Sequence, residues 1–136
     1  MKKLMIFGKS ITITEQELTK EHLGDLLYSQ LLEIYNQIKK EGKIEIFGDL
    51  EFEIVEQIDN KKQRIAKLNR NKILVKLNTI TLPKSALKYI ITHEIAHTFT
   101  KRHTKQFWKI VETIYPNYEK GLKLLTKNGK FLNDFY

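Results

Sequence analysis

The sequence contains no cysteine, and this absence rules out both disulfide bonds and a metal site built on thiolates. Proline and glycine are sparse, with two and six residues among 136, and no linker rich in Pro, Gly or Ser divides the chain. We therefore expect a single domain over residues 1–136, a length that can bury a modest core. Any bound metal must be held by His, Asp or Glu side chains.

Long hydrophobic runs are missing as well. No segment approaches the roughly 18 apolar residues of a membrane span. The apolar stretch Leu4–Phe7 is shorter than the roughly 7–15 residues of a signal-peptide core. The composition, with 41% hydrophobic and 29% charged residues, is that of a soluble globular protein. We expect a cytoplasmic protein that does not associate with a membrane.

Acidic residues are outnumbered by basic ones, 16 to 24, which gives a formal net charge of +8. A basic surface of this size can attract nucleic acid or acidic peptides. The lysines are spread along the chain, however, and a surface rich in Lys and Glu also suits a thermophile's protein. Nucleic acid therefore stays a candidate partner, and the sequence does not indicate an oligomeric state.

Hydrophobic periodicity predicts an α+β fold with a strand-rich middle between helical segments. A long amphipathic helix is expected from about Thr14 to Lys40, with Thr14 and Glu17 as a capping box and Gly42 at its end. Turn signals between short alternating segments predict an antiparallel meander. The predicted strands are Lys3–Phe7, Lys43–Phe47, Leu50–Ile58, Gln63–Asn69 and Lys72–Asn78. The predicted C-terminal helices run from Pro83 to about Thr100, from about Thr104 to Tyr115, and from about Tyr118 to Lys127.

The helix that starts at Pro83 contains the run His93-Glu94-Ile95-Ala96-His97. Residues four apart project from one helix face, so His93 and His97 can share one metal ion. A catalytic zinc site uses three protein ligands and leaves one position to water. Glu94 is turned by about 100° from His93, which places its carboxylate near that water as a general base. Because the flanking residues are apolar, these side chains would be costly to bury without a metal or a partner.

The third ligand is expected to be His103, which follows His97 after the segment Thr98–Arg102. That segment is long enough to end the helix and return a side chain to the metal, and Thr104 can cap the next helix. The alternative is a carboxylate on this next helix, with Glu112 as the first candidate and Glu119 as the second. His22 has no partner motif and is interpreted as a surface or packing residue.

The stretch from about Ile73 to Phe107 resembles the YgjP/WLM-type branch of the zincin-like metallopeptidases and, more distantly, SprT-like proteases. The matching segments are Leu74–Asn78, Leu82-Pro83, Tyr89–His97, the run His103-Thr104-Lys105-Gln106-Phe107-Trp108 and, as an echo, Tyr115-Pro116-Asn117-Tyr118. The chain departs from the branch at Ala66–Asn71, where a Trp-Gly-Ser segment is usual.

The resemblance implies a zincin-like fold in which a small, antiparallel-rich sheet packs on the active-site helix. An edge strand would then bind an extended peptide by strand addition. The resemblance also implies that His93, His97 and His103 bind Zn²⁺ and that Glu94 is the general base. The expected function is therefore a zinc-dependent peptidase that acts on peptide or protein substrates. Tyr89 and Tyr115 are chemically suited to stabilise the oxyanion.

Two alternative functions stay open. The first is a DNA-associated, SprT-like protease or a nucleic-acid-binding module, which the basic residues Lys101, Arg102, Lys105 and Lys109 favour. The second is a latent or degenerate zinc hydrolase whose cleft is closed by the apolar C-terminal tail, with Asp134 offered to the metal. The apolar tail residues are Phe131, Leu132, Phe135 and Tyr136.

Overall fold

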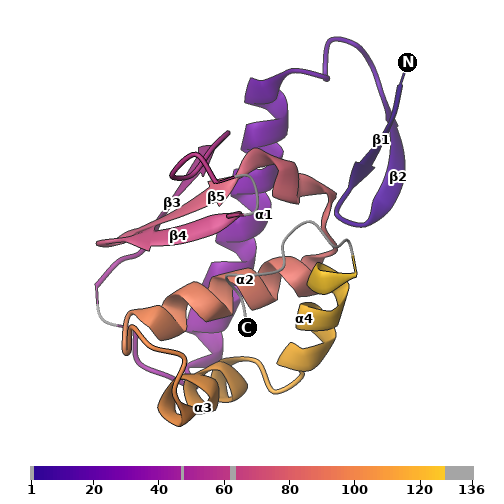
Figure 1. The fold of residues 1–136 in the computed structure, drawn as a ribbon. Coiled ribbons are helices and arrows are strands. Elements are labelled where there is room, and N and C mark those ends of the chain that lie inside the picture. Colours follow the sequence, from indigo (N-terminus) through magenta and orange to yellow (C-terminus); the bar gives the residue numbers. More distant parts are fainter. Residues whose placement is uncertain (1, 47, 62–63, 128–136) are drawn as a thin grey trace.

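The structure is a computed structural model that describes residues 2–46, 48–61 and 64–127. It confirms the α+β class, with a hairpin, a three-stranded sheet and helices (Figure 1). In chain order the elements are β1 (Lys2–Ile6), β2 (Lys9–Ile13), α1 (Lys20–Glu41), β3 (Glu51–Val55), β4 (Ala66–Asn69), β5 (Lys72–Lys76), the 3₁₀ helix η1 (Leu77–Thr81), α2 (Lys84–His97), α3 (Lys105–Ile114) and α4 (Tyr118–Thr126). Among the described residues, no helix combines the length and the apolar character needed to cross a membrane.

The N-terminal hairpin pairs β1 with β2 in antiparallel register across the turn Phe7-Gly8. Both turn residues have positive φ, 51° and 81°, which is the backbone conformation of the tight turns that match strand twist. The N–H groups of Phe7 and Gly8 donate to the carbonyl oxygens of Ile80 and Thr81, at 2.7 and 3.1 Å. The hairpin is therefore anchored on η1, immediately before α2. Strand β2 was not among the predicted strands.

Helix α1 begins later than predicted. Its N-cap is Thr19, whose hydroxyl accepts a hydrogen bond from the backbone N–H of His22 at 3.1 Å. The predicted capping box does form, since Thr14 and Glu17 exchange two backbone-to-side-chain bonds of 3.2 Å. These bonds close a turn before the helix and do not start it. The predicted end is confirmed, because Gly42 adopts the left-handed conformation with φ of 62°.

The three-stranded sheet has the order β3-β5-β4, with β5 in the centre. Strands β4 and β5 form an antiparallel hairpin, whereas β3 pairs with β5 in parallel. The predicted meander is therefore wrong at β3. Asp59 and Asn60, both with positive φ, form a turn after β3. Asp59 is tied to the start of β4 by Lys67, whose Nζ lies 2.9 Å from its carboxylate.

The predicted strand Lys43–Phe47 is not formed over its described residues 43–46. Ile44 and Ile46 are instead partly buried against the core from a loop. The apolar alternation that suggested a strand is therefore explained by packing. The apolar tail lies outside the described residues.

Helix α2 lies at the centre of the molecule. It packs against α1, α3, α4 and strand β4, and it crosses α1 in Figure 1. Every residue from Tyr89 to Ala96 is buried. Pro83 is its N-cap, so the helix begins at Lys84, one residue later than expected, and it ends at His97 rather than near Thr100. The sequence motif thus lies on a helix that is surrounded by the rest of the fold.

Candidate metal centre

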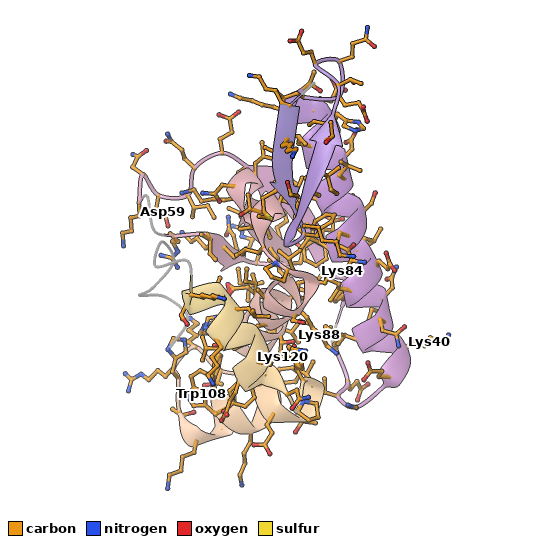
Figure 2. The ribbon with its side chains drawn as sticks, turned by 90° about the vertical axis from the view of Figure 1, so that its right-hand side faces the viewer. Lys40, Asp59, Lys84, Lys88, Trp108 and Lys120 are labelled. Carbon is orange, nitrogen blue, oxygen red and sulfur yellow. The ribbon has the colours of Figure 1, made fainter. Side chains whose placement is uncertain are left out.

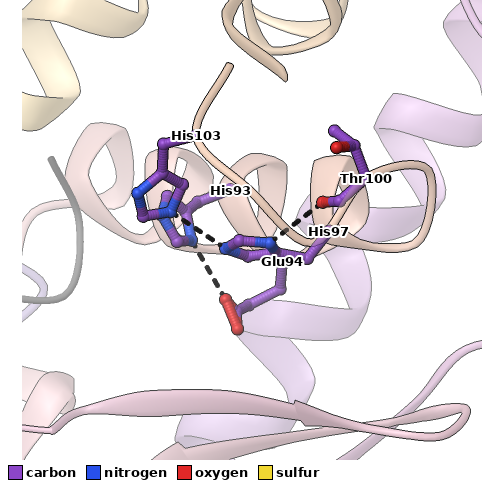
Figure 3. A network of polar contacts seen from close by, with 5 residues as sticks. All are labelled: His93, Glu94, His97, Thr100 and His103. Atoms are coloured by element: carbon purple, nitrogen blue, oxygen red, sulfur yellow. Dashed lines mark hydrogen bonds and ion pairs between the residues drawn. The ribbon is translucent and has the colours of Figure 1, made fainter. Parts of the chain in front are cut away.

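The last turns of α2 carry the charged part of the motif into the core. His93 is 2% exposed and Glu94 is 4% exposed. His97, the last residue of the helix, is half-buried. The Nδ1 atom of His93 lies 3.1 Å from Oε2 of Glu94 (Figure 3). A buried carboxylate beside a buried imidazole satisfies two groups that would otherwise be costly to remove from water.

The segment after α2 returns His103 to the end of the helix. Thr98 caps the helix and donates its hydroxyl to the carbonyl of Ile95 at 2.6 Å. The carbonyl oxygen of Thr100 lies 3.2 Å from Nδ1 of His97. Thr104 then starts α3 as its N-cap. In the resulting arrangement, Nε2 of His103 lies 3.2 Å from Nε2 of His97 (Figure 3).

His93, His97 and His103 form a group in which each residue offers one ligand atom and all three atoms lie within 4.8 Å of one another. The alternative third ligands, Glu112 and Glu119, are exposed and are not part of this group. His22 lies on α1 and is not part of it either. The structure thus brings together the three histidines that the sequence motif singled out, with Glu94 beside them.

The donor set fits a metal ion that prefers nitrogen ligands. Two nitrogens bound to one tetrahedral zinc are about 3.3–3.4 Å apart, given zinc–nitrogen bonds of about 2.0–2.1 Å. The separation between the Nε2 atoms of His97 and His103 is 3.2 Å. A proton on Nδ1 of His97, donated to the Thr100 carbonyl, makes Nε2 the nitrogen able to bind a metal. The Glu94 carboxylate lies in a similar way against Nδ1 of His93, which would leave Nε2 of that ring for a metal.

The electrostatic surroundings favour the neutral form of His97. Burial lowers the pKa of this imidazole, and the neighbouring His93 lowers the pKa further. Glu94 and the hydrogen bond to Thr100 act in the opposite direction without reversing the shift. Since only the neutral imidazole binds a metal, the lowered pKa of His97 favours the form of this residue that could bind one.

Aromatic side chains surround the three histidines. The ring centroid of Phe107 lies 5.2 Å from that of His93, 4.8 Å from that of His97 and 4.7 Å from that of His103. Further aromatic contacts follow, in which Tyr89 stacks on Tyr118 and Tyr118 stacks on Trp108. Figure 2 shows Trp108 on α3 beside α4. The aromatic residues therefore join α2, α3 and α4 around the cluster.

The two tyrosines considered for oxyanion binding differ in position. Tyr89 is fully buried, and its ring centroid lies 6.0 Å from that of His93. Burial raises the pKa of Tyr115, whose hydroxyl is hydrogen-bonded to Ser85. Ser85 lies near the start of α2, about 12 Å along the helix axis from His93. Tyr115 therefore belongs to the packing of α2 and not to the histidine cluster.

Sequence patterns did not reveal two parts of this site. Phe107 is an apolar position at helical spacing, and such a position carries no sign of what its ring contacts. The Thr100 carbonyl is a backbone group, so its contact with His97 has no residue-type signal. The spacing between His97, His103 and Phe107 was the only available clue to both.

Comparisons with known proteins identify the class of this chain. The model of the family described as "YgjP-like, metallopeptidase domain" matches residues 57–128, more than half of the chain. The chain belongs to the YgjP-like metallopeptidase family, as the sequence resemblance indicated.

Among solved structures, the fold is similar to that in the crystal structure of the metallopeptidase zymogen of Pyrococcus abyssi abylysin. The TM-score is 0.61 at 19% sequence identity, over 74% of this chain and 96% of that chain. At this identity the likeness shows a common fold. A comparison with curated protein sequences gave no match.

Proposed function

We propose that this protein is a zinc-dependent peptidase in which His93, His97 and His103 bind the metal and Glu94 is the general base. The observation that carries the proposal is that one ligand nitrogen from each of three imidazoles lies within 4.8 Å of the others, beside a buried carboxylate, in a chain of a metallopeptidase family. Three imidazoles are also the ligand number at which a zinc site keeps a position open for catalysis.

When bound, a zinc ion supplies Lewis acidity that polarises the peptide carbonyl and makes water a stronger acid. Glu94 then accepts a proton at its carboxylate as the water oxygen attacks the carbonyl carbon. The same carboxylate returns the proton to the amine nitrogen as the carbon–nitrogen bond breaks. The low exposure of Glu94 keeps competing bulk water away from this proton transfer.

Strand β4 is the proposed binding edge for an extended substrate. It is an edge strand of the sheet, paired with β5 on one side, and it packs against α2. Its other edge has no strand beside it among the residues that the structure describes. A peptide added there in extended form would run alongside the helix that carries His93 and Glu94.

The test is hydrolysis of an unfolded protein by the zinc-loaded enzyme and by Glu94→Gln. We expect the variant to keep its zinc and to lose a factor of about 10²–10⁴ in rate, the usual contribution of a general base. Glu112→Gln, which changes an exposed glutamate outside the cluster, serves as the control and should cut like wild type. A chelator should abolish the activity of wild type and of Glu112→Gln. If zinc-loaded Glu94→Gln cut as fast as wild type, the assignment of the base would be wrong.

A second candidate function is association with nucleic acid, in the manner of a DNA-associated protease. The supporting observation is that the segment containing His103 carries Lys101, Arg102, Lys105 and Lys109, all of them exposed. Binding through phosphate contacts would weaken steeply as salt rises. The test measures binding of single-stranded and double-stranded DNA as the salt concentration is raised. The double variant Lys101→Gln/Arg102→Gln is compared with Lys2→Gln/Lys3→Gln, the charge-matched control. Absence of binding at low salt would remove this candidate.

A further inference from the structure

One aromatic side chain contacts all three histidines of the cluster. The Phe107 ring lies 4.7–5.2 Å, centroid to centroid, from the rings of His93, His97 and His103. The side chain is fully buried, with an exposed fraction of 0%. The three imidazoles come from a helix and from the loop after it, so this ring is a shared surface for groups that are not neighbours in the sequence.

Local structure explains how the ring reaches this position. Thr104 is the N-cap of α3, and its hydroxyl accepts a hydrogen bond from the backbone N–H of Phe107 at 3.4 Å. Phe107 therefore lies in the first turn of the helix. Helical side chains point back toward the N-terminus, so its ring lies over the start of α3, where His103 ends the preceding loop. His103, Thr104 and Phe107 form one local unit.

We propose that Phe107 is a positioning residue that holds the three imidazoles in the orientation needed to bind zinc. This inference rests on the function proposed above. An imidazole can rotate about two bonds, and a rigid ring packed against it removes rotamers that would turn its nitrogens away. The Phe107 ring meets His93 nearly edge to face, at 76°, and meets His97 and His103 at 46° and 56°. It supports all three rings from one side.

His103 gains most from this support. It is an exposed residue in a loop, whereas His93 is buried within α2. A loop side chain pays a larger ordering cost when it binds a metal, and prior packing removes part of that cost. The apolar ring also excludes water from one side of the cluster, which strengthens metal–ligand interactions.

The experiment measures zinc affinity, by competition with a chromophoric chelator, for wild type, Phe107→Leu, Phe107→Met and Phe52→Leu. Phe52 is the matched control, because it is a buried phenylalanine that packs edge to face on Tyr35 at 5.6 Å, within β3. We expect the Phe107 variants to bind zinc about 10–100-fold more weakly, the usual effect of losing an outer-shell contact. Phe52→Leu should lose stability without losing affinity. When Co²⁺ is bound in place of zinc, its absorption bands should weaken and broaden in the Phe107 variants only.

Wild-type affinity and an unchanged Co²⁺ spectrum in a folded Phe107→Leu or Phe107→Met would overturn the inference. A measurement on the wild type makes the test independent of variant folding. Nuclear Overhauser contacts between the Phe107 ring and the three imidazoles should persist when zinc is added, and their loss would also overturn it. Failure of the proposed function has a different signature: wild type itself would bind no zinc if the metal site were wrong, and would bind zinc without hydrolysing protein if only the catalytic role were wrong.

Discussion

The Nε2 atoms of His97 and His103 lie 3.2 Å apart, although one residue ends α2 and the other precedes α3. Two polar groups of the intervening turn fix this approach. The Thr100 carbonyl is hydrogen-bonded to the far nitrogen of the His97 ring, and the Arg102 carbonyl accepts the N–H of Thr104. The turn therefore brings the His103 ring back to the end of α2.

The choice of third ligand leads to the first prediction. His103→Ala should lose zinc on gel filtration, because two imidazoles from one helix are too few for a stable site. Glu112→Ala should keep zinc at wild-type stoichiometry, because Glu112 is exposed and outside the cluster. Elemental analysis of the two purified variants is the measurement. Loss of zinc from Glu112→Ala and retention by His103→Ala would reverse the assignment.

Removal of the metal should lower stability without unfolding the protein. The hydrophobic core extends over α1, the sheet and α2 and includes Leu27, Leu31 and Ile73, which lie on elements other than those that carry the histidine cluster. Zinc that binds only the folded state adds about 2.7 kcal/mol when its concentration is 100 times its Kd. We expect an unchanged far-ultraviolet circular dichroism spectrum after chelation and a lower Tm, which zinc restores. The Tm of His97→Ala should not respond to zinc, and collapse of the wild-type spectrum on chelation would contradict the prediction.

The helices and the histidine cluster could be predicted because their signals are local. Residues four apart share a helix face whatever surrounds the helix, so His93 and His97 were found from spacing alone. Gly42 and Pro83 mark helix ends for steric reasons that act within a few residues. His103 followed from the length of a turn and the cap at Thr104, both of which the structure contains.

The sheet was predicted less well because strand pairing is not local. The parallel pairing of β3 with β5 depends on the path of the segment between β3 and β4, which apolar alternation does not encode. The start of α1 was misplaced for a related reason. Thr14 and Glu17 form their reciprocal bonds in an isolated turn, and a capping pattern does not reveal whether a helix follows.

The cap of α3 should matter for the metal as well as for the helix. Thr104→Ala and Thr19→Ala each remove a hydroxyl that accepts one N–H of the first turn of a helix, so each should cost about 0.5–2 kcal/mol of stability. Only Thr104 is adjacent to His103, so only its removal should weaken zinc binding. Urea unfolding and chelator competition on both variants separate the two effects. Equal zinc affinity in both would show that the cap does not hold the ligand.

The contact between α4 and α2 depends on a glycine. A Cβ at Gly121 would overlap the carbonyl oxygen of Ser85 and would lie 2.9 Å from Cβ of Tyr89. Both atoms belong to α2 and are held by its backbone, so Gly121→Ala must push the helices apart, at a cost of about 1–3 kcal/mol. Tyr89 also contacts His93, so the shift should reach the cluster and reduce zinc affinity.

Gly24→Ala is the matched control for this substitution. Gly24 lies inside α1, and a Cβ there would meet nothing within 4 Å. The exchange should therefore raise stability by about 0.5–1 kcal/mol, because glycine loses more backbone entropy than alanine in a helix. The two variants should change the urea midpoint in opposite directions while secondary structure content stays the same. If Gly121→Ala were stabilised instead, α4 could move away from α2 at no cost. The close approach of these helices would then not contribute to holding Tyr89 against His93.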